Sequence, residues 1–209
     1  MSRGLLRLLH LRDQAEAAAA DMIDERARIR KIRDAEPAKA ISAFNLFQTP
    51  DALAERMVSL VPQAGDGIRI LEPSAGLGRL YRAIRKRCRA SHLTLIDSSP
   101  ECCGELYRLI DGDSRSSLLN RDFLNYSPAH KYDCVVMNPP FKQGTDVKHI
   151  KHALSMTRPG GIVIALCFDG ARQNKHLKPY ADTWEPLGPD VFRPEGTRAS
   201  VVLMTQVAT

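Results

Sequence analysis

Short apolar runs recur along the chain from residue 68 onward, and each ends in a polar or glycine-containing stretch. The runs have the length of buried strands, while the segments between them show helical spacing of apolar residues. We therefore expect strands at 68–72, 93–97, 133–137 and 162–168, and helices at 79–90, 99–110, 145–157 and near 170–181. Strands that alternate with helices predict an α/β fold, a Rossmann-like doubly wound sheet that is mostly parallel.

Turn-forming residues separate these elements. In "TPDALAERMVSLVP", Thr49 is the expected N-cap of a further helix, Pro50 its first residue and Pro62 its stop. The stretch 111–117 is rich in Asp, Ser and Gly and predicts a loop, and "RPGG" at 158–161 predicts a turn. The last elements are expected to be an antiparallel hairpin with strands at roughly 190–193 and 199–207.

The first 40 residues differ in pattern from the rest. Residues 10–35 lack Gly and Pro and predict an N-terminal helix, in which Ala15, Met22 and Ile29 recur at a spacing of seven. We expect 1–40 to be an appendage, either a docking or homodimer helix or an arm that reaches a substrate, and 41–209 to be the main domain. The leucine-rich start is interrupted by charge, so it predicts neither a signal peptide nor a membrane anchor.

Charge and cysteine content narrow the class of protein. The net charge of +6 favours a polyanionic partner. Five cysteines without a CxxC pair argue against a disulfide framework and against zinc, so we expect a cytoplasmic protein without a metal site. On the basic helix, Arg79, Arg82, Lys86 and Arg89 share one face, which is either simply solvated or in contact with phosphates.

Unusual polar residues stand at the ends of the expected strands, where doubly wound sheets bind ligands. Glu72 precedes a turn that contains Gly76 and Gly78, but GxGxxG is absent, and an acid in the turn favours a ligand with a cationic group. Asp97 ends the next strand, where an acid can accept hydrogen bonds from ribose hydroxyls or cap the following helix. Asp122 can accept from an adenine amino group, and Phe123 can cover the ring.

The stretch "CVVMNPPF" (134–141) ends a buried strand in an amide, two prolines and an aromatic ring. This combination suits a site that holds an amino group during methyl transfer. The exocyclic amine of adenine is a poor nucleophile because its lone pair is delocalised into the ring. Two acceptors aimed at its N–H bonds, the Asn138 side-chain oxygen and the Pro139 carbonyl, stabilise the charge that develops on attack. The prolines fix the loop, and Phe141 offers a face on which a base can stack.

The spacing and order of these stretches resemble those of the class I S-adenosylmethionine-dependent methyltransferases of the DNA adenine-N6 type. The resemblance covers about 44–207 and rests on "FNLFQTP", "LEPSAGLG", "LTLID", "RDF" and "NPPF". It implies S-adenosylmethionine as cofactor and a catalytic motif made of Asn138, Pro139, Pro140 and Phe141. The cofactor-binding residues that it implies are Phe47, Gln48, Thr49, Pro50, Glu72, Pro73, Ser74, Ala75, Gly76, Gly78, Asp97, Asp122, Phe123 and Asn138.

The resemblance implies a nucleic acid as partner, DNA favoured over RNA, with the adenine flipped out of the stack. Only 68 residues follow "NPPF", so we expect no separate recognition domain. Residues expected to border the substrate are Phe141, His149, Arg193, Thr197 and Arg198. The alternatives are an RNA methyltransferase acting on adenine N6 or guanine N2, a protein glutamine methyltransferase, and a non-catalytic nucleic-acid-binding subunit.

Overall fold

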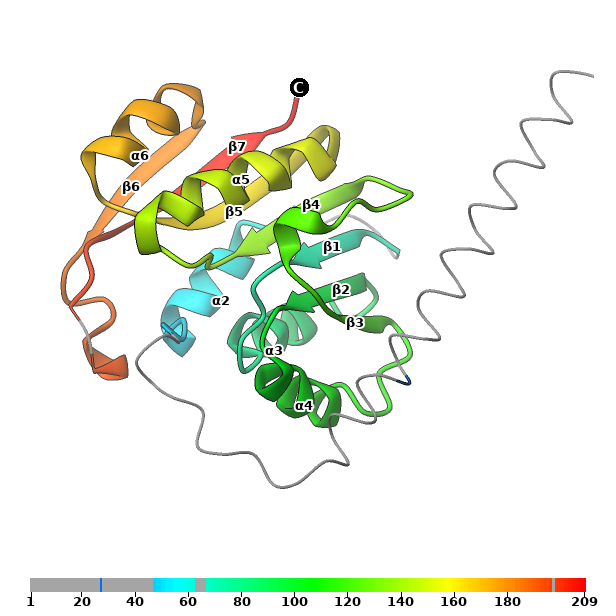
Figure 1. The fold of residues 1–209 in the computed structure, drawn as a ribbon. Coiled ribbons are helices and arrows are strands. Elements are labelled where there is room, and N and C mark those ends of the chain that lie inside the picture. Colours follow the sequence, from blue (N-terminus) through cyan, green and yellow to red (C-terminus); the bar gives the residue numbers. More distant parts are fainter. Residues whose placement is uncertain (1–26, 28–46, 63–66, 197) are drawn as a thin grey trace, which may run out of the picture.

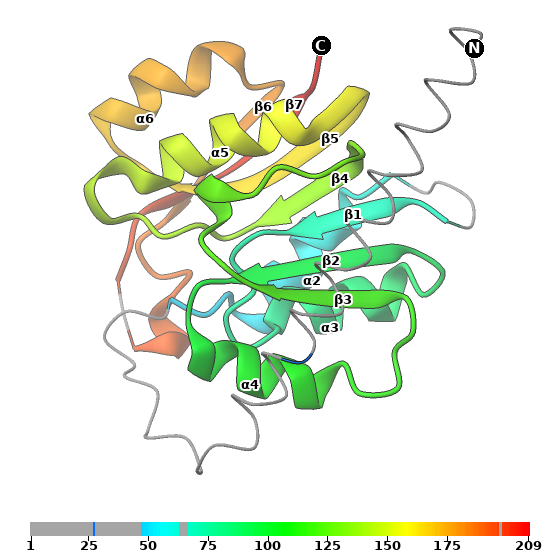
Figure 2. The same cartoon turned by 45° about the vertical axis from the view of Figure 1, so that its right-hand side comes forward.

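The computed structural model describes residues 27, 47–62, 67–196 and 198–209. Its centre is a seven-stranded sheet in the order β3-β2-β1-β4-β5-β7-β6 (Figures 1 and 2). The strands are β1 (Arg69–Glu72), β2 (His92–Asp97), β3 (Ser116–Asn120), β4 (Tyr132–Met137), β5 (Thr157–Phe168), β6 (Thr183–Gly188) and β7 (Val201–Val207). The first five strands pair in parallel and β7 pairs antiparallel with both neighbours, so the expected Rossmann-like sheet with a terminal antiparallel hairpin is confirmed.

Helices cover both faces of the sheet (Figure 2). The α-helices are α2 (Asp51–Ser59), α3 (Arg79–Arg87), α4 (Pro100–Leu109), α5 (Thr145–Met156) and α6 (Ala171–His176), joined by short 3-10 turns η2 (Phe123–Asn125), η3 (Lys142–Gly144), η4 (Lys178–Tyr180) and η5 (Arg193–Glu195). Adjacent strand residues point to opposite faces. Ile70 therefore packs with the core under α2, α3 and α4, whereas Leu71 packs with the core under α5.

The predicted strands at 68–72, 93–97 and 133–137 are confirmed within one residue at each end. The predicted loop at 111–117 is shorter than expected, because β3 begins at Ser116. The predicted "RPGG" turn lies inside β5 as a bulge, since Tyr132 pairs with Thr157 and Cys134 with Ile162. The helix expected near 170–181 ends at His176 and only a 3-10 turn follows, because Pro179 has no N–H to continue it.

The first strand of the final hairpin was predicted in the wrong place. It is β6, whose Pro186 is compatible with pairing because β6 lies at the edge of the sheet. The apolar pair at 191–192, which suggested a strand, belongs instead to the following loop, where the fully buried Phe192 fills the core. The expected appendage at 1–40 and its boundary lie outside the described residues and stay predictions.

Two further findings concern the helices and the cysteines. In the described part of the chain, no helix has the length and apolar character needed to cross a membrane. The five cysteines are all free thiols, and four of them are buried.

Candidate functional site

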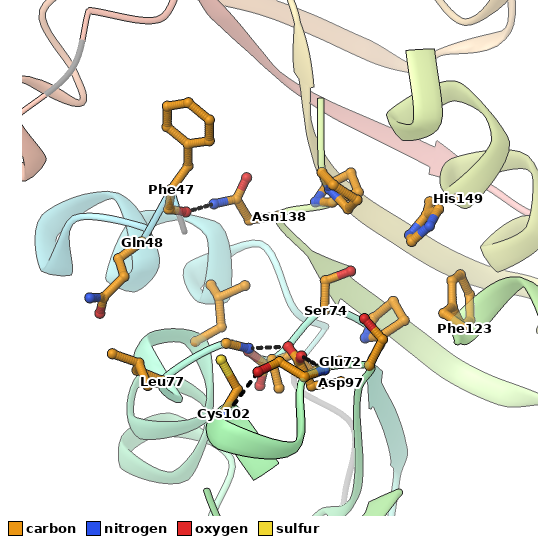
Figure 3. Close-up of a pocket in the computed structure, with 18 of the residues that line it drawn as sticks. Phe47, Gln48, Glu72, Ser74, Leu77, Asp97, Cys102, Phe123, Asn138 and His149 are labelled. Atoms are coloured by element: carbon orange, nitrogen blue, oxygen red, sulfur yellow. Dashed lines mark hydrogen bonds between the residues drawn. The ribbon is translucent and has the colours of Figure 1, made fainter. Parts of the chain in front are cut away.

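A cavity of about 780 Å³ opens at the carboxyl ends of β1, β2 and β4 (Figure 3). The chain runs from β1 toward β2 and β3 on one side and returns to β4 and β5 on the other, so the cavity lies at the point where the strand order reverses. Fifteen of the predicted site residues line it: Phe47, Gln48, Thr49, Glu72, Pro73, Ser74, Ala75, Gly76, Asp97, Asp122, Phe123, Asn138, Pro139, Pro140 and His149.

Asn138 follows the last residue of β4, and its amide has a fixed orientation. Its Nδ2 donates to the Phe47 carbonyl at 2.7 Å and to Thr49 Oγ1 at 3.1 Å. Its Oδ1 is buried and has no hydrogen-bond partner. Because both donors of the amide are used, the oxygen is held as a free acceptor at the cavity wall.

Thr49 was predicted to be the N-cap of α2, and this prediction is wrong. Pro50 occupies that position of α2, and no side chain caps the helix. The buried Thr49 hydroxyl accepts from the Asn138 amide instead. The start of α2 therefore supports the end of β4, although the two segments are about 90 residues apart in sequence.

Glu72 ends β1 and is 1% exposed. Its Oε2 has no hydrogen-bond partner. Burial, and secondly the nearby Asp97 carboxylate, raise the pKa of Glu72 well above its usual value. A buried acceptor without a donor costs free energy, and a cationic ligand would relieve that cost. The position therefore suits the ammonium group of an amino acid.

Asp97, at the end of β2, ties the glycine turn to the next helix. Its Oδ2 accepts from the Gly76 N–H and its Oδ1 from the Ser99 N–H, both at 2.8 Å. Burial raises the pKa of Asp97, and these backbone N–H groups act in the opposite direction. Ser99, rather than Asp97, caps α4. Each carboxylate oxygen has a second lone pair, so the group can still accept from two hydroxyls.

Gly78 makes the close approach of this turn possible. It is the N-cap of α3 with a φ of 77°, in the left-handed region that favours glycine. A Cβ there would stand 2.5 Å from Leu109 Cδ2. Gly78 does not line the cavity itself, and neither does Pro50, although both were predicted to bind the cofactor.

The opposite end of the cavity is formed by the η2 turn and α5. Asp122 is exposed and caps η2 by accepting from the Leu124 N–H at 2.9 Å. Phe123 is 2% exposed, and its ring packs edge-on against His149 with centroids 5.3 Å apart. His149 was expected beside the substrate, and the structure places it next to Phe123. Its Nδ1 is buried without a partner, and burial lowers the pKa of its imidazole to about 4.

Two predicted substrate residues, Arg193 and Arg198, do not line the cavity. Arg193 is exposed in η5, and Arg198 forms an ion pair with Asp190 at 3.4 Å. Thr197 lies outside the described residues. Phe141 does not line the cavity either, but it follows the lining residue Pro140, and its ring centroid lies 5.9 Å from that of Phe47.

The cationic face of α3 is largely used within the chain. Arg79 pairs with Asp51 at 2.7 Å, and Lys86 pairs with Glu55 at 2.6 Å. Arg82 donates to the Leu77 carbonyl. These contacts favour a structural, solvated face over one that contacts phosphates.

Sequence reasoning missed several residues of the cavity. Arg79 lines it and donates from Nε to Gln48 Oε1 at 3.1 Å. Arg79 directly follows Gly78, which could have indicated a place in the cofactor turn. Because the residues after it are basic, it was interpreted as part of an exposed helix face. The other unpredicted residues of the lining are Leu77, Leu80, Ser98, Ser99, Glu101, Cys102, Arg121, Leu124 and Thr145.

The sheet order and the cavity define a Rossmann-like α/β fold with a ligand site at the switch point. The model of the methyltransferase small domain family matches residues 47–173. The chain belongs to this family, and S-adenosylmethionine is its cofactor.

Many solved structures share the fold, including the two that follow. The chain is similar to TrmN from Thermus thermophilus, with a TM-score of 0.60 and 22% identity, over 75% of this chain and 48% of that one. It is also similar to the type I restriction-modification system methyltransferase subunit from Streptococcus thermophilus, with a TM-score of 0.63 and 17% identity, over 78% of this chain and 45% of that one.

A curated relative adds a closer match over a shorter stretch. The tRNA1(Val) (adenine(37)-N6)-methyltransferase of Aliivibrio fischeri is 34% identical over 77 residues. The match covers 35% of this chain and 32% of the relative, so the chain spans about a third of the length of that protein.

Proposed function

We propose that the protein transfers a methyl group from S-adenosylmethionine to the exocyclic N6 amine of adenine in a nucleic acid. One observation carries the proposal: the buried Asn138 Oδ1 is free, while the amide nitrogen is fixed by Phe47 and Thr49. The free oxygen stands where "NPPF" was expected to accept from an amine. An amide that presents its oxygen rather than its NH₂ group selects a substrate with N–H donors.

The residues present fit the cofactor. Glu72 can receive the ammonium group, because its Oε2 is buried without a donor. Asp97 can accept from the ribose hydroxyls, and Phe123 lines the part of the cavity proposed for the adenine. Asp122 is proposed to accept from the adenine amino group. When bound, S-adenosylmethionine supplies the electrophilic methyl group.

The substrate amine is proposed to lie between Asn138 Oδ1 and the Pro139 carbonyl. As the nitrogen forms its new bond, its two N–H groups become more acidic and their hydrogen bonds strengthen, so these acceptors stabilise the transition state more than the ground state. Pro139 is buried and Pro140 exposed, and the pair restricts the backbone that carries the second acceptor. The product ammonium is acidic and can lose its proton to water, so a dedicated base is not required.

DNA is the polymer that we propose first, on the order of motifs in the sequence, while the net charge of +6 suits DNA and RNA equally. RNA is the second candidate, and a specific observation favours it: the relative that is 34% identical over 77 residues is a tRNA adenine-N6 methyltransferase. Both polymers offer the same amine, so the proposed chemistry is common to them. The base must be unpaired or flipped in either case.

Product analysis tests the proposal. The full chain is incubated with isotopically labelled S-adenosylmethionine and, separately, with unmethylated duplex DNA, single-stranded DNA, total RNA and a protein extract. Each sample is digested, and the labelled species is identified by mass spectrometry. The matched control is Asn138→Ala, which we expect to bind the cofactor and to lose the label.

The labelled product distinguishes the candidates. N6-methyldeoxyadenosine supports the first proposal, and N6-methyladenosine moves the substrate to RNA. Label on guanine N2 or on glutamine keeps amine methylation but refutes adenine as the target. Nucleic-acid binding that is unchanged in Asn138→Ala, without label from the wild-type protein, favours a non-catalytic subunit.

A further inference from the structure

Phe47 was expected to hold the cofactor, but its side chain points elsewhere. The ring is 41% exposed, although it lines the cavity. Figure 3 shows it pointing away from Glu72 and Asp97, the residues of the proposed cofactor end. It lies on the same side of the cavity as Asn138. An aromatic ring exposed at the mouth of a cavity is a typical contact for a ligand that enters from solvent.

A second ring, that of Phe141, contacts Phe47 and follows the cavity-lining Pro140 in sequence. The centroid of the partly buried Phe141 lies 5.9 Å away, and the two ring planes are tilted by 47°. The two residues belong to distant segments, one before α2 and one after β4. The fold thus brings two phenyl rings together directly outside the proposed reaction centre.

The backbone of Phe47 connects these rings to the amine site. Its carbonyl accepts from Asn138 Nδ2 at 2.7 Å, and this bond leaves Asn138 Oδ1 free. A base held by the ring of Phe47 therefore lies next to the acceptor that its amine needs. One residue both orients the catalytic amide and presents a stacking surface.

We propose that Phe47 is a substrate-binding residue, and that Phe47 and Phe141 together form a clamp that receives the unstacked adenine. This inference rests on the proposed function. Stacked aromatic planes lie about 3.4 Å apart, so a base between two parallel rings needs a centroid separation of about 7 Å. The observed separation is 5.9 Å, so the rings need to move apart by only about 1 Å and to become parallel.

Charge at the mouth is consistent with a nucleotide. Lys142 directly follows Phe141 and is exposed, so its ammonium group is available to a phosphate. Arg172, from α6, donates to the Gln143 carbonyl in the same loop. Gln143 has a φ of 56°, so the loop that carries Phe141 adopts a conformation that this contact helps to hold.

Binding measurements on single variants test the clamp. Fluorescein-labelled oligo(dA) and oligo(A) of about 12 nucleotides are titrated with protein saturated with S-adenosylhomocysteine, and anisotropy is recorded. Cofactor affinity is measured separately by calorimetry with S-adenosylhomocysteine. The variants are Phe47→Ala, Phe47→Trp and the control Phe168→Ala. Phe168 is 42% exposed at the carboxyl end of β5, so it matches Phe47 in exposure but does not line the cavity.

We expect Phe47→Ala to weaken binding of one or both oligonucleotides by about tenfold or more, the loss typical of one base–aromatic stack. Its affinity for S-adenosylhomocysteine should stay within about twofold of wild type. Phe47→Trp should retain oligonucleotide binding, because it keeps an aromatic face. Phe168→Ala should match wild type in both measurements. The oligonucleotide that responds shows which polymer supplies the base.

Three outcomes would overturn the clamp and leave the proposed function standing. If Phe47→Ala weakens cofactor binding and leaves the oligonucleotides unaffected, Phe47 is a cofactor residue. If Phe168→Ala has the same effect as Phe47→Ala, the loss is a general property of exposed rings. If Phe47→Ala binds and methylates like wild type, the clamp is wrong while the proposed function stands. A wild-type protein that neither binds nor methylates adenine-containing polymers would instead refute the proposed function, and the clamp with it.

Discussion

The orientation of the Asn138 amide is the feature whose perturbation tests the mechanism most directly. Thr49→Val removes the hydroxyl that accepts from Asn138 Nδ2 at 3.1 Å and keeps the shape of the side chain. The second acceptor, the Phe47 carbonyl at 2.7 Å, belongs to the backbone and stays in place. The substitution therefore weakens the hold on the amide without removing the oxygen that is proposed to accept from the substrate amine.

The size of the effect follows from these contacts. One neutral hydrogen bond contributes about 1 kcal/mol, and this is the preference that the amide loses for its productive orientation. Because about 1.4 kcal/mol corresponds to a factor of ten in rate, Thr49→Val should slow methyl transfer by about three- to tenfold. Asn138→Ala removes the acceptor itself and should slow it by about 10²–10³, as loss of one preorganised hydrogen-bonding group does at comparable sites.

Single-turnover methyl transfer is the appropriate assay, because product release does not mask the chemical step. The substrate is the polymer that gives labelled product, and S-adenosylhomocysteine affinity is measured in parallel. Thr49→Ser is the matched control, since it keeps the hydroxyl and should restore most of the rate. A Thr49→Val protein as fast as wild type would refute the orienting role of the hydroxyl. A loss of cofactor affinity equal to the loss of rate would assign Thr49 to cofactor binding.

Two further predictions concern the cofactor turn. A bound ammonium group favours the ionised form of Glu72 and so lowers the raised pKa of this side chain. Binding therefore releases a proton. The affinity for S-adenosylhomocysteine should rise with pH until the pH passes the pKa of Glu72 in the free protein. Glu72→Gln should weaken binding by about ten- to hundredfold and flatten this dependence in calorimetry at several pH values; an unchanged slope would contradict the assignment. Gly78→Ala, with a Cβ 2.5 Å from Leu109 and a φ of 77°, should destabilise the protein by about 2–4 kcal/mol, seen as a lower Tm. Gly112→Ala is its control. Gly112 has a similar φ of 79°, but a Cβ there would meet open space, so this substitution should cost only about 1–2 kcal/mol. Equal losses in the two variants would refute the packing argument.

Apolar runs bounded by turn residues predicted the central strands, because buried parallel strands have a local signature. The edge strand β6 has no such signature. Its sequence contains Pro186, and only its place beside β7 makes pairing possible. The pair at 191–192 looks like a strand, but Phe192 fills the core from a loop. Both errors arise because tertiary packing, rather than local pattern, decides these segments.

The position of the cavity could be predicted because the ends of the apolar runs can also be recognised from the local sequence. Glu72, Asp97 and Asn138 each follow an apolar run, and all three line one cavity. The contacts that orient them join distant segments and have no local pattern. The Thr49 hydroxyl was interpreted as a helix cap because a cap is the short-range use of such a residue, yet its partner lies at the end of β4. The contact between the Phe47 and Phe141 rings likewise joins distant segments, which a linear pattern does not reveal.

Buried polar atoms without hydrogen-bond partners indicate that the cavity is a ligand site. In the described part of the chain, the Oε2 of Glu72, the Oδ1 of Asn138 and the Nδ1 of His149 are buried without hydrogen-bond partners, and all three residues line this cavity. Each such atom costs about 1–3 kcal/mol, a large share of the stability of an ordinary domain. Several such atoms around one cavity are expected when a bound ligand supplies their hydrogen-bond partners and so removes this cost. The three atoms also require different partners, since Glu72 suits a cation, Asn138 an N–H donor and the neutral His149 a polar group beside Phe123. A cationic amino acid group, an exocyclic amine and a purine meet these requirements together, and S-adenosylmethionine with the proposed adenine substrate would supply all three.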